Sequence, residues 1–173
     1  MRRWIVVGLG LLAMGSVPGC SDRLADMQNQ LKGTWVLESR ELSDRTLIQS
    51  PRISGAFSWV PIDSRKAHVT LNVLIDEGDR FPRAFDYAAS TYEVSTSAIT
   101  RKRHLLIRQG YRSSAESPIS GYLKAKTAKG KISVEEDGVI RISHERGFYQ
   151  VFKGDTMTAA FPEVFVDTWK RIR

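Results

Sequence analysis

The sequence predicts an all-β protein in which an antiparallel meander of strands closes into a β-barrel. Three observations favour this class. Apolar residues alternate with polar ones in many short segments, turn-forming residues separate these segments closely, and no long amphipathic helical pattern occurs. Closure is expected because it removes the exposed sheet edges that invite aggregation. A chain of 173 residues is the size of one such domain.

Eleven segments carry the strand pattern. They are 34–40, 55–60, 66–75, 80–88, 104–109, 121–127, 131–134, 139–144, 148–152, 156–161 and 164–171. Pro82 cannot donate a hydrogen bond to a neighbouring strand, so we expect an edge strand or a loop at 80–88. The polar segments 41–50 and 113–118 are expected to be loops.

Two turns indicate that consecutive strands form hairpins. Asp137 and Gly138 lie between the segments 131–134 and 139–144, and Gly154 and Asp155 lie between 148–152 and 156–161. Asp and Gly tolerate the positive φ angles that tight turns require. We therefore expect a β-hairpin at each place.

The composition excludes several classes of protein. Hydrophobic residues make up 42% of the chain and charged residues 26%, which is typical of a globular domain and unlike a disordered chain, a collagen or a polytopic membrane protein. The single Cys, Cys20, excludes an intramolecular disulfide and any metal site built from several thiolates.

Residues 1–19 have the pattern of a signal peptide. Two arginines precede an apolar run of about 11 residues, whereas a membrane-spanning helix needs about 20. The segment 17–20, Val-Pro-Gly-Cys, resembles the lipobox of bacterial lipoprotein precursors. This resemblance implies cleavage before Cys20 and lipid attachment to its thiol. The alternative is an ordinary secretory signal in which Cys20 has no role.

Lipidation would anchor the protein in a membrane of the cell envelope through two or three acyl chains on Cys20. Ser21 follows the cysteine, which resembles the enterobacterial pattern for the outer membrane, so we expect an anchor there facing the periplasm. Loss of residues 1–19 removes two Arg and no acid from a formal charge of +7 and leaves +5.

After Cys20, the apolar residues Leu24, Met27 and Leu31 are spaced by three and four positions, which predicts a short helix. We therefore divide the chain into a lipoprotein signal peptide at 1–19, a lipid-anchored tether with a short helix at 20–30, and a barrel domain at 31–173.

The start and end of this domain resemble lipocalins and lipocalin-like domains. Gly33 and Trp35 form a Gly-x-Trp motif between a helical turn and the first strand, and the segment 154–171 is similar to the last hairpin of small bacterial members. In that family the Trp closes one end of the barrel and a late Arg packs across its ring. The resemblance assigns this role to Arg171, with Arg173 as the alternative.

No residue pattern indicates catalysis, a cofactor or a metal site. His68, His104 and His144 lie far apart, and none has a second ligand two residues away. The chain also lacks a Gly-x-Ser-x-Gly elbow and a glycine-rich phosphate loop. We expect no enzyme, and we interpret the acidic segment 135–137 as a solvated hairpin tip.

Two basic features are interpreted mainly as solvated faces. One is the segment 101–104, Arg-Lys-Arg-His, and the other consists of Lys124, Lys126, Lys129 and Lys131. Their functional alternative is contact with anionic lipid head groups beside the anchor. Nucleic acid is not an expected partner of an exported lipoprotein, and no protein partner is indicated.

Two functions are consistent with these patterns. In the first, a barrel of about eight strands holds one small hydrophobic ligand, such as a fatty acid or a lysophospholipid. In the second, the barrel is filled and serves as a structural or protein-interaction module of the envelope. The second is motivated by Val69, Leu71, Val73 and Ile75, which alternate as regularly as a filled core requires.

Overall fold

The computed structural model describes residues 20–76, 84–109, 120–122, 126–135 and 137–172. One helix, α1 (Cys20–Leu31), precedes the strands. The strands are β1 (Gly33–Leu42), β2 (Leu47–Gln49), β3 (Ile53–Pro61), β4 (Lys66–Ile75), β5 (Ala84–Val94), β6 (Ala98–Gln109), β7 (Ser120–Tyr122), β8 (Lys126–Val134), β9 (Ile140–His144), β10 (Tyr149–Lys153), β11 (Thr156–Phe161) and β12 (Phe165–Ile172). A short 3-10 turn, Glu145–Gly147, joins β9 to β10.

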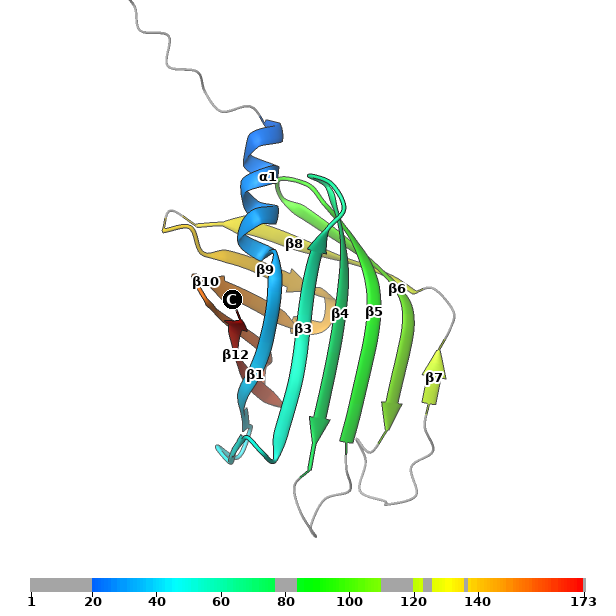
Figure 1. Cartoon of the computed structure of the whole chain (residues 1–173), viewed down its shortest axis with the longest axis vertical. Helices are drawn as coiled ribbons and strands as arrows, with labels where there is room; N and C mark the ends of the chain where they lie inside the picture. The colour runs from blue at the N-terminus through cyan, green and yellow to red at the C-terminus, as the bar shows by residue number, and fades with distance from the viewer. Residues whose placement is uncertain (1–19, 77–83, 110–119, 123–125, 136, 173) are drawn as a thin grey trace, which may run out of the picture.

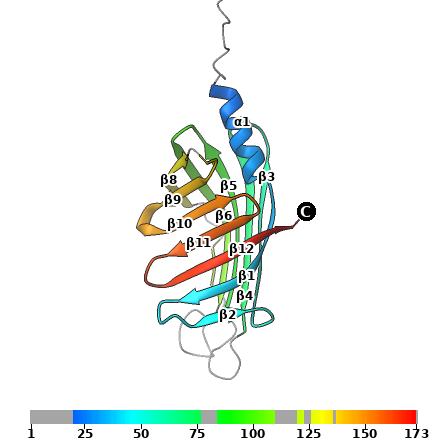
Figure 2. The same ribbon diagram turned by 90° about the vertical axis from the view of Figure 1, so that its left-hand side faces the viewer.

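Ten of these strands form a closed antiparallel ring within the described residues. The order is β1, β3, β4, β5, β6, β8, β9, β10, β11 and β12, and β12 pairs back onto β1. The strands β2 and β7 lie beside the ring and pair with β1 and β6. The tall strands β3–β6 form one wall, and β8–β12 form the wall across from it (Figure 1, Figure 2). The predicted all-β meander barrel is confirmed.

The ring has ten strands instead of the predicted eight or so, which makes it wider. Within it, β5 and β6 extend across most of residues 89–103, where no strand is predicted. The sequence pattern does not show this hairpin, since inward positions hold Ser90, Arg101 and Arg103 where apolar side chains are expected. Of the strand predicted at 80–88, residues 84–88 belong to β5, which continues to Val94, and residues 80–83 lie outside the described residues. Pro82 and the loop predicted at 113–118 lie outside the described residues.

The loop predicted at 41–50 is wrong in two places. The strand β1 continues to Leu42, and β2 occupies Leu47–Gln49. Ile48 is buried although its neighbours are exposed, and one buried residue is too short a pattern to predict a strand. Of the segment predicted as one strand at 121–127, residues 121–122 belong to β7 and residues 126–127 to β8, both of which pair with β6, and residues 123–125 lie outside the described residues.

Both predicted hairpins are present. Backbone hydrogen bonds join Glu135 to Val139 and Gly138 to Glu135, so a tight turn connects β8 to β9. Gly138 has a φ angle of 78° and Gly154 one of 57°, which glycine adopts without strain. Glu135 and Asp137 are exposed at the first turn, as expected of a solvated tip.

The helix α1 lies at one end of the barrel (Figure 1). Its apolar stripe, Leu24, Met27 and Leu31, is buried in the same core cluster as three tryptophans, Trp35, Trp59 and Trp169. The indole Nε1 of Trp59 donates a hydrogen bond of 2.7 Å to Gln28 Oε1 on the helix. The predicted short helix therefore packs onto the barrel through its apolar face.

The strands β1 and β12 close the ring, and a buried ion pair joins them. Arg40 and Asp167 are register partners, and Arg40 donates from Nε to Asp167 Oδ1 at 2.6 Å and from Nη2 to Oδ2 at 2.7 Å. The guanidinium also lies 4.2 Å from the centre of the Phe165 ring. Each charge is therefore satisfied where β1 and β12 meet.

Candidate functional site

A cavity of about 860 Å³ lies inside the barrel. Small-molecule sites in proteins commonly enclose about 300–1,000 Å³. Exposed residues that line it, among them Arg108, Lys126, Thr127 and Arg146, mark where the cavity meets solvent. The interior is therefore large enough for a small ligand and open to it.

One side of the cavity is apolar. Its lining comes from β3, β4, β11 and β12 and includes Phe57, Val69, Leu71, Val73, Met157 and Trp169. The alternation predicted for β4 is present, since Val69, Val73 and Ile75 are buried and Leu71 is partly buried. These side chains line an open space, so the barrel is not filled.

The other side of the cavity is basic. Arg101 and Arg103 of β6 line it, whereas Lys102 and His104, which alternate with them, are exposed and do not. Interpreting the whole segment 101–104 as a solvated face is therefore wrong for the two arginines. Because all four positions are basic, the sequence offers no contrast between the two faces of the strand.

Neighbouring strands surround these arginines with few negative groups. Arg103 lies opposite Ser90 of β5 on one side and opposite Lys126 of β8 on the other, while Arg101 lies opposite Tyr92 and Ala128. The Nε atoms of Arg101 and Arg103 are buried and have no hydrogen-bond partner among the described residues. Two buried donors beside the lumen are thus without an acceptor among the described residues.

The electrostatic environment of Arg103 shows this excess of positive charge. Burial, followed by the charge of Arg101, lowers the pKa of the Arg103 guanidinium, and Asp86 opposes this decrease. Asp86, however, accepts a hydrogen bond of 2.7 Å from Arg108 Nη2. Six cationic side chains line the cavity against three carboxylates, so the described lining carries an excess of three positive charges.

His144 also faces the cavity, next to the basic wall. Burial, followed by the charge of Arg101, lowers its pKa from 6.5 to about 4, and a hydrogen bond with Gln150 opposes this decrease. Its ring stacks on Phe148 at 5.4 Å between centres and meets Tyr92 edge-on at 6.2 Å. His144 is therefore neutral at pH 7 and adds no charge to the lining.

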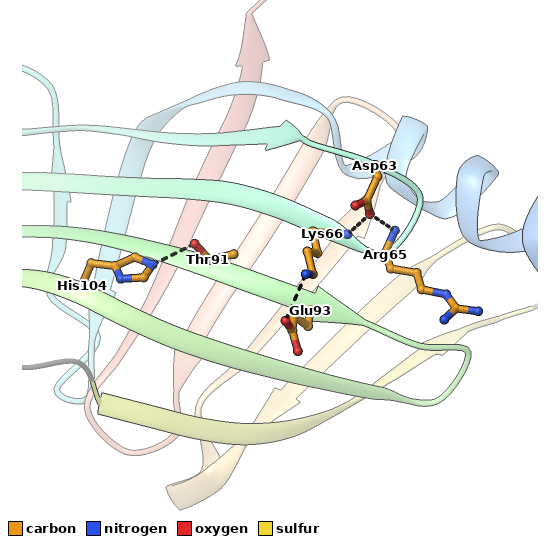
Figure 3. Close-up of polar contacts among 6 residues, drawn as sticks. All are labelled: Asp63, Arg65, Lys66, Thr91, Glu93 and His104. Atoms are coloured by element: carbon orange, nitrogen blue, oxygen red, sulfur yellow. Dashed lines mark hydrogen bonds and ion pairs between the residues drawn. The ribbon is translucent and has the colours of Figure 1, made fainter.

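The three histidines do not meet. His68 and His104 are exposed residues of β4 and β6, whereas His144 lines the cavity. Figure 3 shows His104 beside Thr91, whose Oγ1 lies 2.8 Å from His104 Nε2. The parts of the chain that the structure describes contain no group of three His, Cys, Asp or Glu residues that could hold a metal ion.

The outer surface of the β4–β6 wall carries ordinary solvated contacts. Lys66 and Glu93 form an exposed ion pair of 3.6 Å, and Asp63 Oδ1 accepts hydrogen bonds from the backbone of Arg65 and Lys66 (Figure 3). Lys129 and Lys131 of β8 are exposed, in agreement with the predicted solvated face. Lys126 is exposed but lines the cavity, and Lys124 lies outside the described residues.

At the end of the barrel near α1, Arg171 packs on Trp35. Its guanidinium carbon lies 4.3 Å from the centre of the indole, and its Nη2 donates a hydrogen bond to the carbonyl of Gln30. Gly33 has a φ angle of 140°, and a Cβ added there would lie 3.4 Å from Arg171 Cδ. Arg171 thus has the contact that the resemblance assigns to it, while Arg173 lies outside the described residues.

Cys20, the predicted lipid attachment site, is the first residue of α1. No helix in the described residues has the length and apolar character required to span a membrane. Comparisons with protein-family models, with curated proteins and with solved structures found no match for this chain.

Proposed function

We propose that the protein is a lipid-anchored lipoprotein of the cell envelope whose barrel binds one small hydrophobic ligand, such as a fatty acid or a lysophospholipid. The observation that carries this proposal is the cavity of about 860 Å³, with apolar side chains along one side. Burial of an alkyl chain there contributes about 0.8 kcal/mol for each CH₂ removed from water. A filled structural barrel would not leave this space.

The position of the helix supports an anchored protein. The 12 residues of α1 begin at Cys20 and end where the barrel begins. At 1.5 Å per residue, a helix of this length spans about 18 Å, so acyl chains on Cys20 would hold the barrel close to the bilayer. The single Cys would carry the acyl chains, so the ligand would be bound by the side chains that line the cavity.

Ligand binding is tested with the full chain carrying Cys20→Ser, so that no attached acyl chain can enter the cavity. We expect native mass spectrometry to detect one bound lipid, either co-purified or after addition of dodecanoate. Ala88 lines the cavity and its neighbour Ala89 does not. Ala88→Phe should therefore abolish the adduct, whereas Ala89→Phe should retain it. Equal loss in both variants, or no adduct in the parent chain, would count against a ligand-binding barrel.

Anchoring is tested separately in cells. We expect the parent chain to incorporate labelled palmitate and to sediment with the outer membrane, and Cys20→Ala to do neither. Ser21→Ala, next to the attachment site, serves as the control and should still be labelled. Labelling that persists in Cys20→Ala would show that the cysteine is not the attachment site.

A further inference from the structure

The inner wall formed by β5, β6 and β8 places cations side by side without neutralising them. Arg103 and Lys126 are register partners, and both line the cavity. Like charges directly opposite each other on neighbouring strands destabilise a sheet. The described ion pairs include neither Arg101 nor Arg103. This wall therefore has unfavourable electrostatics unless an anion lies between the cations.

The carboxylates that line the cavity supply this anion only in part, since the charge of Asp86 acts on Arg103 but is shared with Arg108. Asp167 is held by Arg40 where β1 meets β12, Asp86 by Arg108, and Glu145 is exposed. The uncompensated charge is thus concentrated at Arg101 and Arg103. Both side chains line the same cavity, because alternate residues of a strand point to the same face, so their guanidinium groups can bind the oxygens of one head group.

We infer that the ligand is a single-chain amphiphile with an oxyanion head group, a carboxylate or a phosphate, bound by Arg101 and Arg103 while its alkyl chain lies against Val69, Leu71 and Val73. This inference rests on the proposed function and specifies the chemistry of its ligand. The cationic residues at the opening, Lys126 and Arg146, attract the same anion. A choline head group is disfavoured because its quaternary ammonium would add a further positive charge.

The test measures displacement of the neutral dye phenylnaphthylamine from the full chain carrying Cys20→Ser. The competitors share one chain length and differ only in the head group: dodecanoate, dodecyl phosphate, dodecanol and dodecylphosphocholine. Two charge-assisted hydrogen bonds should give the two anions an affinity about ten- to hundredfold higher than that of dodecanol. Inorganic phosphate is added alone to detect an anion site that needs no alkyl chain.

Variants locate the head group. Arg101→Met and Arg103→Met remove the guanidinium but keep an unbranched apolar side chain, and each should remove most of the preference for dodecanoate over dodecanol, with dodecanol affinity unchanged. Arg103→Lys should retain part of the preference. Lys102→Met removes a charge from the exposed face of the same strand and should leave the preference intact. A melting curve for each variant shows that the fold is retained.

The outcomes distinguish failure of ligand binding from failure of the head-group assignment. If neither the dye nor any amphiphile binds, the proposed function itself fails. If all four amphiphiles bind equally, or if Lys102→Met weakens anion binding as much as Arg103→Met, the barrel binds hydrophobic ligands but the head-group assignment is wrong. If inorganic phosphate alone raises the melting temperature as much as dodecyl phosphate does, the site is a free-anion site and the assignment of an amphiphile is overturned.

Discussion

Buried and partly buried arginines lie at two places in the barrel, and their hydrogen-bond partners differ between the two. Where β1 and β12 close the ring, Arg40 forms two hydrogen bonds to Asp167, and their side chains are only 6% and 4% exposed. On the β5–β6 wall, Arg101 and Arg103 end in the cavity with buried Nε atoms that lack a partner among the described residues. The buried cation between the closing strands is neutralised by a carboxylate of the protein, whereas the two arginines of the wall have no such ion-pair partner among the described residues.

This difference gives the arginines separate roles, one in stability and one in ligand binding. Arg40 uses its hydrogen-bond donors on the carboxylate of Asp167, and this pair joins two strands that lie far apart in the sequence. A guanidinium without such a partner costs stability in the empty barrel, and the cost is recovered when a ligand supplies the charge. Stability should therefore depend on the first pair and affinity on the second.

The largest effect is expected when the pair of the closing strands is broken. Asp167→Asn leaves Arg40 charged and buried without its counter-ion, which typically costs about 3–5 kcal/mol. Urea unfolding measures this loss. The control Glu93→Gln breaks an exposed pair with Lys66 and should cost less than about 1 kcal/mol. The double variant Arg40→Met with Asp167→Leu should recover most of the loss. Equal costs for Asp167→Asn and Glu93→Gln would show that the buried pair matters no more for stability than an exposed one.

A second effect comes from His144, beside the basic wall. Its pKa is about 4 in the folded chain and 6.5 when unperturbed, so above pH 6.5 the residue is neutral in both states and stability is unaffected. As the pH falls from 6.5 to 4, the unfolded chain binds a proton that the folded chain does not, and stability falls by up to about 3 kcal/mol. Urea unfolding across this window should show a shallower decline in His144→Phe.

His104→Gln is the matched control, since His104 lies on the exposed face of the neighbouring wall. It should keep the pH dependence of the parent chain. Because the charge of Arg101 contributes to the low pKa of His144, Arg101→Met should also raise that pKa in an NMR titration. An unchanged pKa would show that Arg101 exerts no field on this part of the cavity.

The fold was predictable where one face of each strand is apolar. The strands β4 and β11 have the predicted bounds, and the helix packs through the predicted Leu24, Met27 and Leu31. Prediction failed across 89–103, where polar residues point inward. Alternation identifies a buried face only when the two faces differ in polarity, and here Arg101 and Arg103 alternate with Lys102 and His104.

The candidate site was missed for the same reason. A basic segment is usually solvated, and only the register with Ser90 and Lys126 shows that two of its arginines face the lumen. That register depends on a bulge in the β5–β6 pairing between Ala89 and Ser90, which no local pattern indicates. By contrast, the resemblance to lipocalins predicted the contact between Trp35 and Arg171, because it covers both the Gly-x-Trp motif and the last hairpin at 154–171.

A carboxylate introduced on the β5–β6 wall would give its arginines a partner within the protein. Ser90 lies opposite Arg103, faces the cavity and is 6% exposed, so Ser90→Asp places a carboxylate where the head group is expected. We expect the affinity for dodecanoate, measured by dye displacement, to fall about tenfold or more without a lower melting temperature. Thr91→Asp, on the exposed side opposite Lys102, should change neither quantity. Undiminished affinity in Ser90→Asp would place the head group elsewhere.

Arg171 represents a third arrangement, in which the cation lies over an aromatic face with Asp155 Oδ1 4.0 Å from its Nε, and the smallest effect is expected there. Its side chain is 21% exposed, so water screens part of the charge, and a cation over an indole contributes about 0.5–2 kcal/mol. Arg171→Met should therefore lower the free energy of unfolding by about 1 kcal/mol. Lys170→Met, on the exposed neighbouring position, should be neutral.

Because the guanidinium of Arg171 also donates a hydrogen bond to the Gln30 carbonyl at the end of α1, Arg171→Met should increase amide hydrogen exchange in that helix. Unchanged exchange would mean that the apolar stripe of α1 and the hydrogen bond from Trp59 to Gln28 hold the helix on the barrel without help from Arg171.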